Sequence, residues 1–137
     1  VPALTKEANH IYCIDIDDRV IRVGKSRLFT MYENITWFSR DVWDERAWTR
    51  IEKADLIINT SCEHMSNMSE LPPLYKSNAY FAFQSNNMCD IPTHINCVAS
   101  IDEFYSQLPH NATIIAEDEI EDDRGIRYTL IGKLCAE

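Results

Sequence analysis

Short blocks of apolar residues recur along the chain, and their spacing alternates between two patterns. Runs of β-branched and aromatic residues are typical of buried strands, whereas apolar residues that recur every three or four positions are typical of helices that bury one face. The patterns predict strands at 11–16, 34–39, 54–60 and 78–85, and helices at 18–31, 44–52 and 100–108. Because strands alternate with helices, we expect an α/β fold with a Rossmann-like, mostly parallel sheet and helices on both faces. The third strand, 54–60, is expected to be buried on both faces.

Capping residues precede the predicted helices. Asp17 or Asp18 stands before the first helix and Asp44 before the second, where a carboxylate can accept hydrogen bonds from free backbone N–H groups. The third helix opens with Ser100 and has Glu103 three residues later, which is the spacing of a capping box. These signals mark where each helix is expected to begin.

The chain ends in two further apolar runs, at 112–119 and 126–134. The sequence Asp-Asp-Arg-Gly at 122–125 separates them and predicts the turn of an antiparallel hairpin. A length of 137 residues is typical of one domain. We therefore expect a single domain over 1–137, with 1–10 as an N-terminal tail.

Composition narrows the range of partners and compartments. The net charge is −9, whereas proteins that bind nucleic acid usually carry a basic face, so we expect no nucleic-acid partner. The five cysteines form no Cys-x-x-Cys pair, and their odd number predicts free thiols in a reducing, cytoplasmic compartment rather than a disulfide framework. No apolar run has the length of a transmembrane helix and no signal peptide opens the chain, so we expect no membrane contact.

Polar residues gather where the predicted strands end. Asp15 and Asp17 follow the first strand, Asp41 follows the second, and further polar clusters occupy 59–64 and 84–87. Ligands of parallel α/β sheets bind at the carboxyl ends of the strands. We therefore expect these residues to line a single cleft of the size of a nucleoside.

Four segments of the sequence resemble a known family. They read DLIINTSCEHM at 55–65, FQSNN at 83–87, HINCVASIDEF at 94–104 and RYTLIGK at 127–133. With the order of the predicted elements, they resemble class I S-adenosylmethionine (SAM)-dependent methyltransferases, and most of all a bacterial and phage group in that superfamily. The resemblance implies an α/β fold that binds SAM and transfers its methyl group to a small-molecule or protein acceptor.

The resemblance also implies how SAM is held. In the superfamily an acid at the end of the second strand accepts hydrogen bonds from the ribose hydroxyls; Asp15 matches that position, with Asp17 as the neighbouring candidate. An Asp after the third strand receives the adenine amino group, and Asp41 matches it. The backbone N–H of Val42 would then meet a ring nitrogen, and Trp43 would stack on the adenine.

The end of the superfamily's fourth strand faces the transferred methyl group and the acceptor. Asn59, Glu63 and His64 match that region, and the resemblance implies that Glu63 or His64 removes a proton from the acceptor as general base. His94 and Asn96 are candidates for the same cleft or for hydrogen bonds that order their loop.

Cys62, Glu63 and His64 at first also suggest a metal site or a thiol nucleophile. The Cys-x-His spacing is poor for zinc, and no Cys-x-x-Cys pair exists to complete such a site. Adjacent residues on a turn rarely form a catalytic Cys/His pair. We therefore predict no metal ion, and a structural role for Cys62 as a small buried residue.

The sequence departs from the superfamily at its start. The family's first strand and its G-x-G-x-G loop, whose glycines let the backbone approach SAM, have no counterpart in 1–10. That strand is central in the family's sheet, between the strands predicted at 11–16 and 54–60. An upstream segment, another chain or a second copy, or direct pairing of the two flanking strands would fill the gap. The alternative function is a non-catalytic methyltransferase fold that serves as an interaction or structural module.

Overall fold

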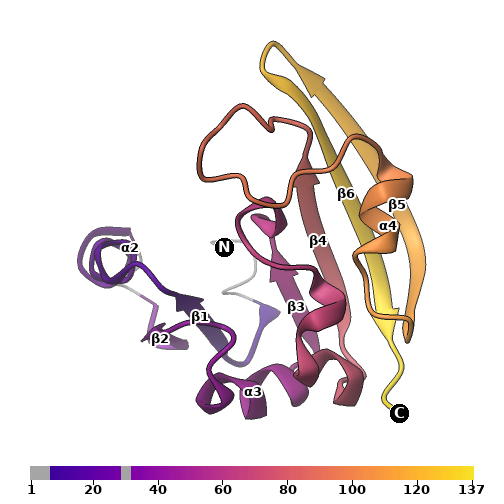
Figure 1. Ribbon diagram of the computed structural model, residues 1–137. Coiled ribbons are helices and arrows are strands. Elements are labelled where there is room, and N and C mark those ends of the chain that lie inside the picture. The colour runs from indigo at the N-terminus through magenta and orange to yellow at the C-terminus, as the bar shows by residue number, and fades with distance from the viewer. Residues whose placement is uncertain (1–6, 29–31) are drawn as a thin grey trace. The chain divides into compact units, whose positions relative to one another are not determined.

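The chain divides into two compact units, and each unit has its own sheet (Figure 1). The units comprise Val1–Arg50 and Ile51–Glu137. The computed structural model describes residues 7–28 and 32–137. None of the described helices is long and apolar enough to cross a membrane. The single domain over 1–137 stays a prediction.

Two parallel strands form the sheet of the first unit. β1 (Ile11–Asp15) pairs with β2 (Ile35–Ser39) along its whole length. In this register Asp15 lies opposite Ser39, so the carboxyl ends of the two strands are level. Both predicted strands are confirmed, and residues that follow β1 and β2 emerge at the same edge of this sheet.

A helical segment follows β1. It consists of α2 (Asp18–Val23) and a π-helical turn, η1 (Gly24–Leu28). Asp17 caps α2, because its carboxylate accepts a hydrogen bond from the backbone N–H of Arg19. The helix predicted over 18–31 is confirmed as far as Leu28, and 29–31 lie outside the described residues.

The helix predicted at 44–52 is also present, as α3 (Glu45–Glu52). Asp44 Oδ1 accepts a hydrogen bond of 3.0 Å from the backbone N–H of Arg46, as expected of a capping residue. The side chains of Ala47 and Ile51, four positions apart on one face, are buried. The capping residue and the apolar spacing together explain why a helix forms at this point.

A four-stranded mixed sheet forms the centre of the second unit. Its strands, in the order β3-β4-β6-β5, are β3 (Leu56–Asn59), β4 (Tyr80–Asn86), β6 (Gly125–Leu134) and β5 (Ala112–Asp122). β3 and β4 are parallel, whereas β6 is antiparallel to both of its neighbours. The mixed α/β class with a C-terminal antiparallel hairpin is confirmed. Among the described strands, β1 and β3 belong to different sheets. The strand that the sequence predicts to be missing would stand between these two.

One face of the four-stranded sheet carries the core of the second unit. Phe81, Phe83 and Leu130 are fully buried there, and the rings of Phe81 and Phe83 are stacked with centroids 4.7 Å apart. The helix α4 (Ile101–Ser106) contributes Phe104, which is also fully buried, and packs near β6 (Figure 1). Fully burying a side chain of this size contributes about 1.5–3 kcal/mol, so this layer is a main source of stability.

The capping box predicted at the start of α4 is present in a modified form. Ser100 Oγ accepts a hydrogen bond of 3.2 Å from the backbone N–H of Glu103. The Glu103 carboxylate reaches back to the backbone N–H of Ala99, rather than to that of Ser100. Two free N–H groups at this helix start are therefore satisfied.

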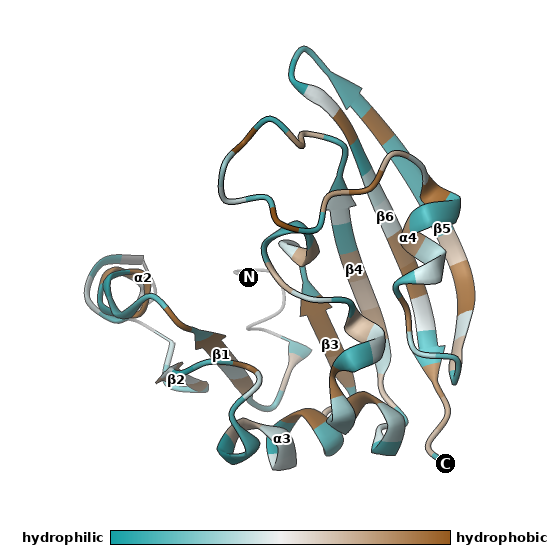
Figure 2. Ribbon diagram, viewed as in Figure 1, coloured by the Kyte–Doolittle hydropathy of each residue, from teal (hydrophilic) through white to brown (hydrophobic). Residues whose placement is uncertain are grey.

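The strand predicted at 54–60 is confirmed, but its predicted burial on both faces is wrong. Leu56 and Ile58 are exposed, and Ile58 retains 48% of its accessible surface. β3 lies at the edge of its sheet, and alternate side chains point to opposite faces, so Ile57 and Asn59 turn toward the less exposed face. The strand is hydrophobic along most of its length (Figure 2), and Leu56 and Ile58 leave part of this apolar surface exposed.

Between β3 and α4 the chain runs through three 3-10 turns, strand β4 and a long loop. The turns are η2 (Cys62–His64), η3 (Met68–Glu70) and η4 (Pro72–Lys76). The 87–99 loop contains a disulfide between Cys89 and Cys97, with Cα atoms 5.6 Å apart. The prediction that the cysteines are free thiols is therefore wrong for this pair: the loop doubles back and brings together two residues separated by eight positions. Cys13, Cys62 and Cys135 are free.

The hairpin of β5 and β6 turns at the predicted place. Gly125 adopts a φ of 153°, which residues with a side chain rarely adopt. Asn87 packs against the turn, and its Oδ1 accepts a hydrogen bond of 2.8 Å from the backbone N–H of Ile126. The turn itself is exposed and largely hydrophilic (Figure 2).

Candidate functional site

Asp15 ends β1 and orders the turn that follows it. Its Oδ1 accepts a hydrogen bond of 2.8 Å from the backbone N–H of Asp17. Its backbone carbonyl accepts another, also of 2.8 Å, from the N–H of Arg40, which follows β2. One carboxylate oxygen and the main chain of Asp15 are thus fixed, whereas no hydrogen bond to Oδ2 is found among the described residues.

Asp41 repeats this arrangement after β2. Its Oδ1 accepts a hydrogen bond of 3.0 Å from the backbone N–H of Trp43. The carbonyl of Val42 accepts a hydrogen bond of 3.2 Å from the indole of Trp48, which holds the segment against α3. Trp43 is half-buried, so part of its ring remains accessible. The first unit therefore brings Asp15 and Asp41 to one edge of its sheet, each with one oxygen held by the backbone.

Asp17 is engaged more fully than Asp15 or Asp41. Its Oδ1 accepts from the backbone N–H of Arg19 at 2.8 Å, and the Arg19 guanidinium contacts both carboxylate oxygens, at 3.2 and 3.0 Å. The side-chain hydrogen bond from Arg19 lowers the pKa of Asp17, so the carboxylate stays ionised. Of the three aspartates, Asp17 has the least free hydrogen-bonding capacity.

In the second unit, Asn59 ends β3 and opens the turn. Its Oδ1 accepts a hydrogen bond of 3.0 Å from the backbone N–H of Ser61. Its Nδ2 donates to the sulfur of Met65 at 2.9 Å, and the sulfur of Met68 lies 3.6 Å away. Thioether sulfur is a weak acceptor, so a ligand oxygen can compete for this amide at little cost.

Cys62 lies beneath the turn and is 1% exposed. Burial raises the pKa of its thiol to about 12, with the nearby Glu63 carboxylate acting in the same direction. Because the thiolate is the nucleophilic form, Cys62 is unreactive at neutral pH. The structure agrees with the predicted structural role of Cys62 as a small buried residue.

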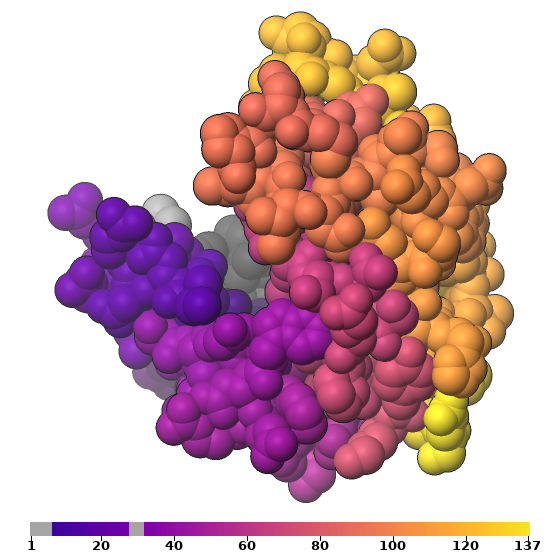
Figure 3. Space-filling view, in the orientation of Figure 1, coloured from indigo at the N-terminus to yellow at the C-terminus, as the bar shows by residue number. Residues whose placement is uncertain are grey.

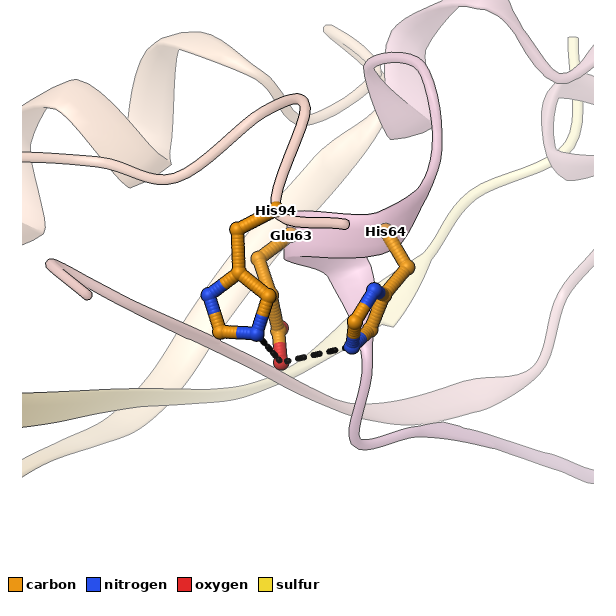
Figure 4. A group of neighbouring side chains, drawn as sticks. All are labelled: Glu63, His64 and His94. Atoms are coloured by element: carbon orange, nitrogen blue, oxygen red, sulfur yellow. Dashed lines mark ion pairs between the residues drawn. The ribbon is translucent and has the colours of Figure 1, made fainter. Parts of the chain in front are cut away.

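Glu63, His64 and His94 form a compact cluster at this turn (Figure 4). Glu63 Oε1 lies 3.7 Å from Nε2 of His64 and 4.0 Å from Nε2 of His94. The side chains of Glu63 and His94 are each 7% exposed, whereas that of His64 is 42% exposed. The two imidazole rings meet edge to face, with centroids 4.6 Å apart. Two ring nitrogens and one carboxylate oxygen thus point toward a common space.

Backbone and side-chain hydrogen bonds hold the two segments of this cluster together. The N–H of Asn96 donates to the carbonyl of Glu63 at 3.0 Å, and the side chain of Asn96 bonds to Asn67 and Gln107. In the space-filling view, the 87–99 loop lies directly against the segment that follows β3 (Figure 3). Asn96 therefore orders the loop, which is the less specific of its two expected roles.

Solved structures similar to this chain include three whose folds overlap nearly all of it. The N-methyltransferase NodS from Bradyrhizobium japonicum WM9 is 12% identical, with a TM-score of 0.68 over 98% of this chain and 78% of NodS. Magnesium protoporphyrin IX methyltransferase (ChlM) from Synechocystis PCC 6803, with bound SAH, is 9% identical, with a TM-score of 0.69 over 97% of this chain and 67% of ChlM. The fibrillarin pre-rRNA processing protein from Methanococcus jannaschii is 15% identical, with a TM-score of 0.65 over 93% of this chain and 57% of that protein. The chain has a methyltransferase fold.

No family model matches the sequence, and no curated protein matches it. The likeness to a bacterial and phage group of methyltransferases therefore stays a prediction. So do the roles of the individual residues, because similarity at these levels of identity shows the fold alone.

Within the methyltransferase fold, the expected site residues belong to two groups. Asp15, Asp17, Asp41, Val42 and Trp43 lie in the first unit, and Asn59, Glu63 and His64 in the second. The single cleft expected to contain both groups stays a prediction. The sequence left two roles open for His94, in the cleft of Glu63 and His64 or in ordering its loop, and the structure brings its ring next to these two residues. Cys89 and Cys97 flank His94 in the sequence, and their disulfide fixes the loop that carries it. This pair of cysteines is the sequence signal that could have indicated a fixed loop.

Proposed function

We propose that this chain binds SAM and contributes to the transfer of its methyl group to a small-molecule or protein acceptor. The observation that carries the proposal is the methyltransferase fold, together with acids at the ends of adjacent parallel strands. One of the similar structures, ChlM, contains SAH, the product that SAM leaves after methyl transfer. The net charge of −9 favours such acceptors over nucleic acid.

Asp15 and Asp41 would hold the nucleoside part of SAM. Each has Oδ1 fixed by a backbone N–H two residues later, which restrains the carboxylate before any ligand arrives. In the proposed complex the remaining oxygen of Asp15 accepts from the ribose hydroxyls, and that of Asp41 accepts from the adenine amino group. Val42 would donate its N–H to a ring nitrogen, and Trp43 would stack on the base. Asp17 contributes less, since Arg19 occupies its carboxylate.

The methyl transfer needs few chemical groups from the protein. A lone pair of the acceptor attacks the methyl carbon, the bond from that carbon to sulfur breaks, and its electron pair stays on sulfur, which leaves SAH. Catalysis is mainly the alignment of acceptor and methyl group. Glu63 or His64 takes the proton that the acceptor loses, and Asn59 offers its weakly bonded amide to orient the acceptor.

Calorimetric titration with SAH tests the cofactor half of this proposal. We expect the chain to bind SAH with micromolar affinity, and Asp15→Ala and Asp41→Ala to weaken binding by at least about tenfold, because each removes a charge-assisted hydrogen bond. Asp18→Ala is the matched control, since Asp18 is an exposed acid of α2 that pairs with Arg22.

Two results would reject the proposal. Unchanged SAH affinity in both Asp15→Ala and Asp41→Ala would remove the assigned nucleoside site. Absence of SAH binding by the folded wild-type chain, with a stable oligomer on a sizing column, would favour the non-catalytic interaction module instead.

A further inference from the structure

The carboxylate of Glu63 is buried without the hydrogen bonds that a buried charge requires. Its Oε2 is inaccessible and has no hydrogen-bond partner among the described residues. Its Oε1 faces two imidazole nitrogens, at 3.7 and 4.0 Å, which is beyond the range of about 2.7–3.2 Å for N–H···O hydrogen bonds. Burying an unpaired carboxylate costs free energy, so we expect a cation to bind beside Glu63.

The hydrogen bond made by His64 determines which of its nitrogens is free. Nδ1 lies 2.9 Å from the carbonyl oxygen of Thr93, and a carbonyl can only accept, so Nδ1 carries the proton and donates it. In the neutral ring, Nε2 then presents a lone pair toward Glu63 Oε1. A histidine that ligates a metal through one nitrogen and donates the other N–H to a carbonyl has this arrangement.

His94 supplies a second nitrogen to the same space. Its Nε2 lies 4.0 Å from Glu63 Oε1, and its side chain is 7% exposed. Its Nδ1 is also buried without a partner among the described residues, so no hydrogen bond assigns this ring another role. In Figure 4 both rings direct Nε2 at the same carboxylate oxygen.

We propose that Glu63, His64 and His94 bind a divalent transition-metal ion, with Zn²⁺ the best match to two imidazoles and one carboxylate. The three ligand atoms lie within 4.8 Å of one another. In a tetrahedral zinc site with bonds of about 2.0–2.2 Å, ligand atoms are roughly 3.3–3.6 Å apart, so the separations between the three ligand atoms shorten by at most roughly 1.5 Å when the site closes. Three protein ligands leave a fourth position open, and the exposure of His64 gives the ion a path from solvent.

A shared proton explains the geometry less well than an ion. Protonation of either imidazole or of Glu63 would create a donor that shortens one contact to hydrogen-bond length. Both contacts, at 3.7 and 4.0 Å, are instead longer than that and leave a space between three electron-rich atoms. The zinc proposal departs from the prediction that the chain binds no metal ion. It leaves Cys62 in its predicted structural role, because the Cys62 sulfur is buried with its own backbone contact, and His94 supplies the third ligand.

The test is zinc titration of the chain without an affinity tag, by calorimetry with a competing chelator. It does not depend on SAM, so its failure and that of methyl transfer are distinguishable. Glu63 and His64 cannot act as general base while they ligate the ion, so the general-base role proposed above applies to the metal-free chain. We expect one Zn²⁺ per chain, and Glu63→Gln and His94→Ala to lower the affinity by at least about tenfold. His110→Ala is the matched control, since His110 is an exposed histidine on another part of this unit, and it should bind as the wild type does.

A Co²⁺ titration and a thermal melt complete the experiment. Bound Co²⁺ should show visible absorption typical of tetrahedral nitrogen and oxygen ligation, and Zn²⁺ should raise the melting temperature of the wild type and of His110→Ala only. If Glu63→Gln or His94→Ala fails to fold, His64→Ala tests the same site, because the His64 side chain is half-exposed and its loss should disturb the fold less. No zinc binding by the folded wild type, wild-type affinity in all three ligand variants, or a sulfur-to-cobalt charge-transfer band would overturn the proposal.

Discussion

Acidic side chains at the ends of strands and the starts of helices stabilise the local backbone of this chain in the absence of any ligand. Asp15, Asp41 and Asp44 each accept a hydrogen bond from the backbone N–H two residues later. Such bonds restrain the side chain, so less conformational entropy remains to be lost when a ligand binds. Asp44 differs from Asp15 and Asp41 because the side chain of Arg46 also contacts its carboxylate. We therefore regard Asp44 as a capping residue and not as a candidate residue for ligand binding.

The Asp44 contacts predict a pH dependence of stability. Hydrogen bonds from Arg46 lower the pKa of Asp44 from 3.8 to about 2. Because the pKa is lower in the folded state, ionised Asp44 stabilises the fold above about pH 4, and this contribution is lost as the pH falls toward 2. Asp44→Asn keeps a capping acceptor but removes the charge.

We expect Asp44→Asn to melt slightly below the wild type at pH 7, by at most about 2 °C because the site is exposed. The difference in melting temperature between the two proteins should become smaller between about pH 4 and pH 2, as measured by circular dichroism. A gap that is constant across this range would show that the charge contributes nothing.

At the scale of elements, local sequence signals predicted most of what the structure contains. Ser100 and Asp44 start helices where expected, because capping depends on residues only two or three positions away. The exposed face of Ile58 was not predictable, since it depends on which strand lies at the edge of the sheet. The pairing of Cys89 with Cys97 was missed because it depends on the path of a loop. The approach of His94 to Glu63 depends on the same loop, and the sequence offered it only as one of two roles.

The β5–β6 hairpin depends on one glycine. A Cβ atom at Gly125 would lie 2.4 Å from Oδ1 of Asn87, which accepts the N–H of Ile126, and the φ of 153° is strained for any other residue. We expect Gly125→Ala to lower the free energy of unfolding by about 1–3 kcal/mol, measured by urea denaturation.

Asp123→Ala, at the exposed tip of the same turn, is the control and should change stability by less than about 0.5 kcal/mol. Equal stability of Gly125→Ala and the wild type would mean that the turn can relax away from Asn87.

At the scale of the whole molecule, the described strands belong to two sheets rather than one. β3 pairs only with β4 among the described strands, so it leaves one edge of the four-stranded sheet without a described neighbour. Leu56 and Ile58 are exposed on this strand. An unpaired, uncharged strand edge is a template for pairing with another strand. These features support the prediction that another chain or a second copy completes the sheet.

We expect sedimentation velocity to show association of the chain that increases with concentration, and Ile58→Lys to shift the chain toward monomer, because a charge on the edge strand opposes pairing. Ile120→Lys is the matched control, since Ile120 is an exposed isoleucine on β5. Wild-type chain that stays monomeric at every concentration would contradict pairing with a second copy.

The other edge strand of the four-stranded sheet, β5, is acidic over its second half. β5 carries Glu117, Asp118, Glu119, Glu121 and Asp122, whereas β3 carries no charged residue. Any strand that approached β5 would have to bring its backbone into this concentrated negative field, and two copies of the chain meeting there would repel one another. We therefore expect an added strand to pair at β3 rather than along the acidic half of β5, so that copies of the chain would join in pairs rather than in the open-ended fibres that a sheet with two receptive edges can form.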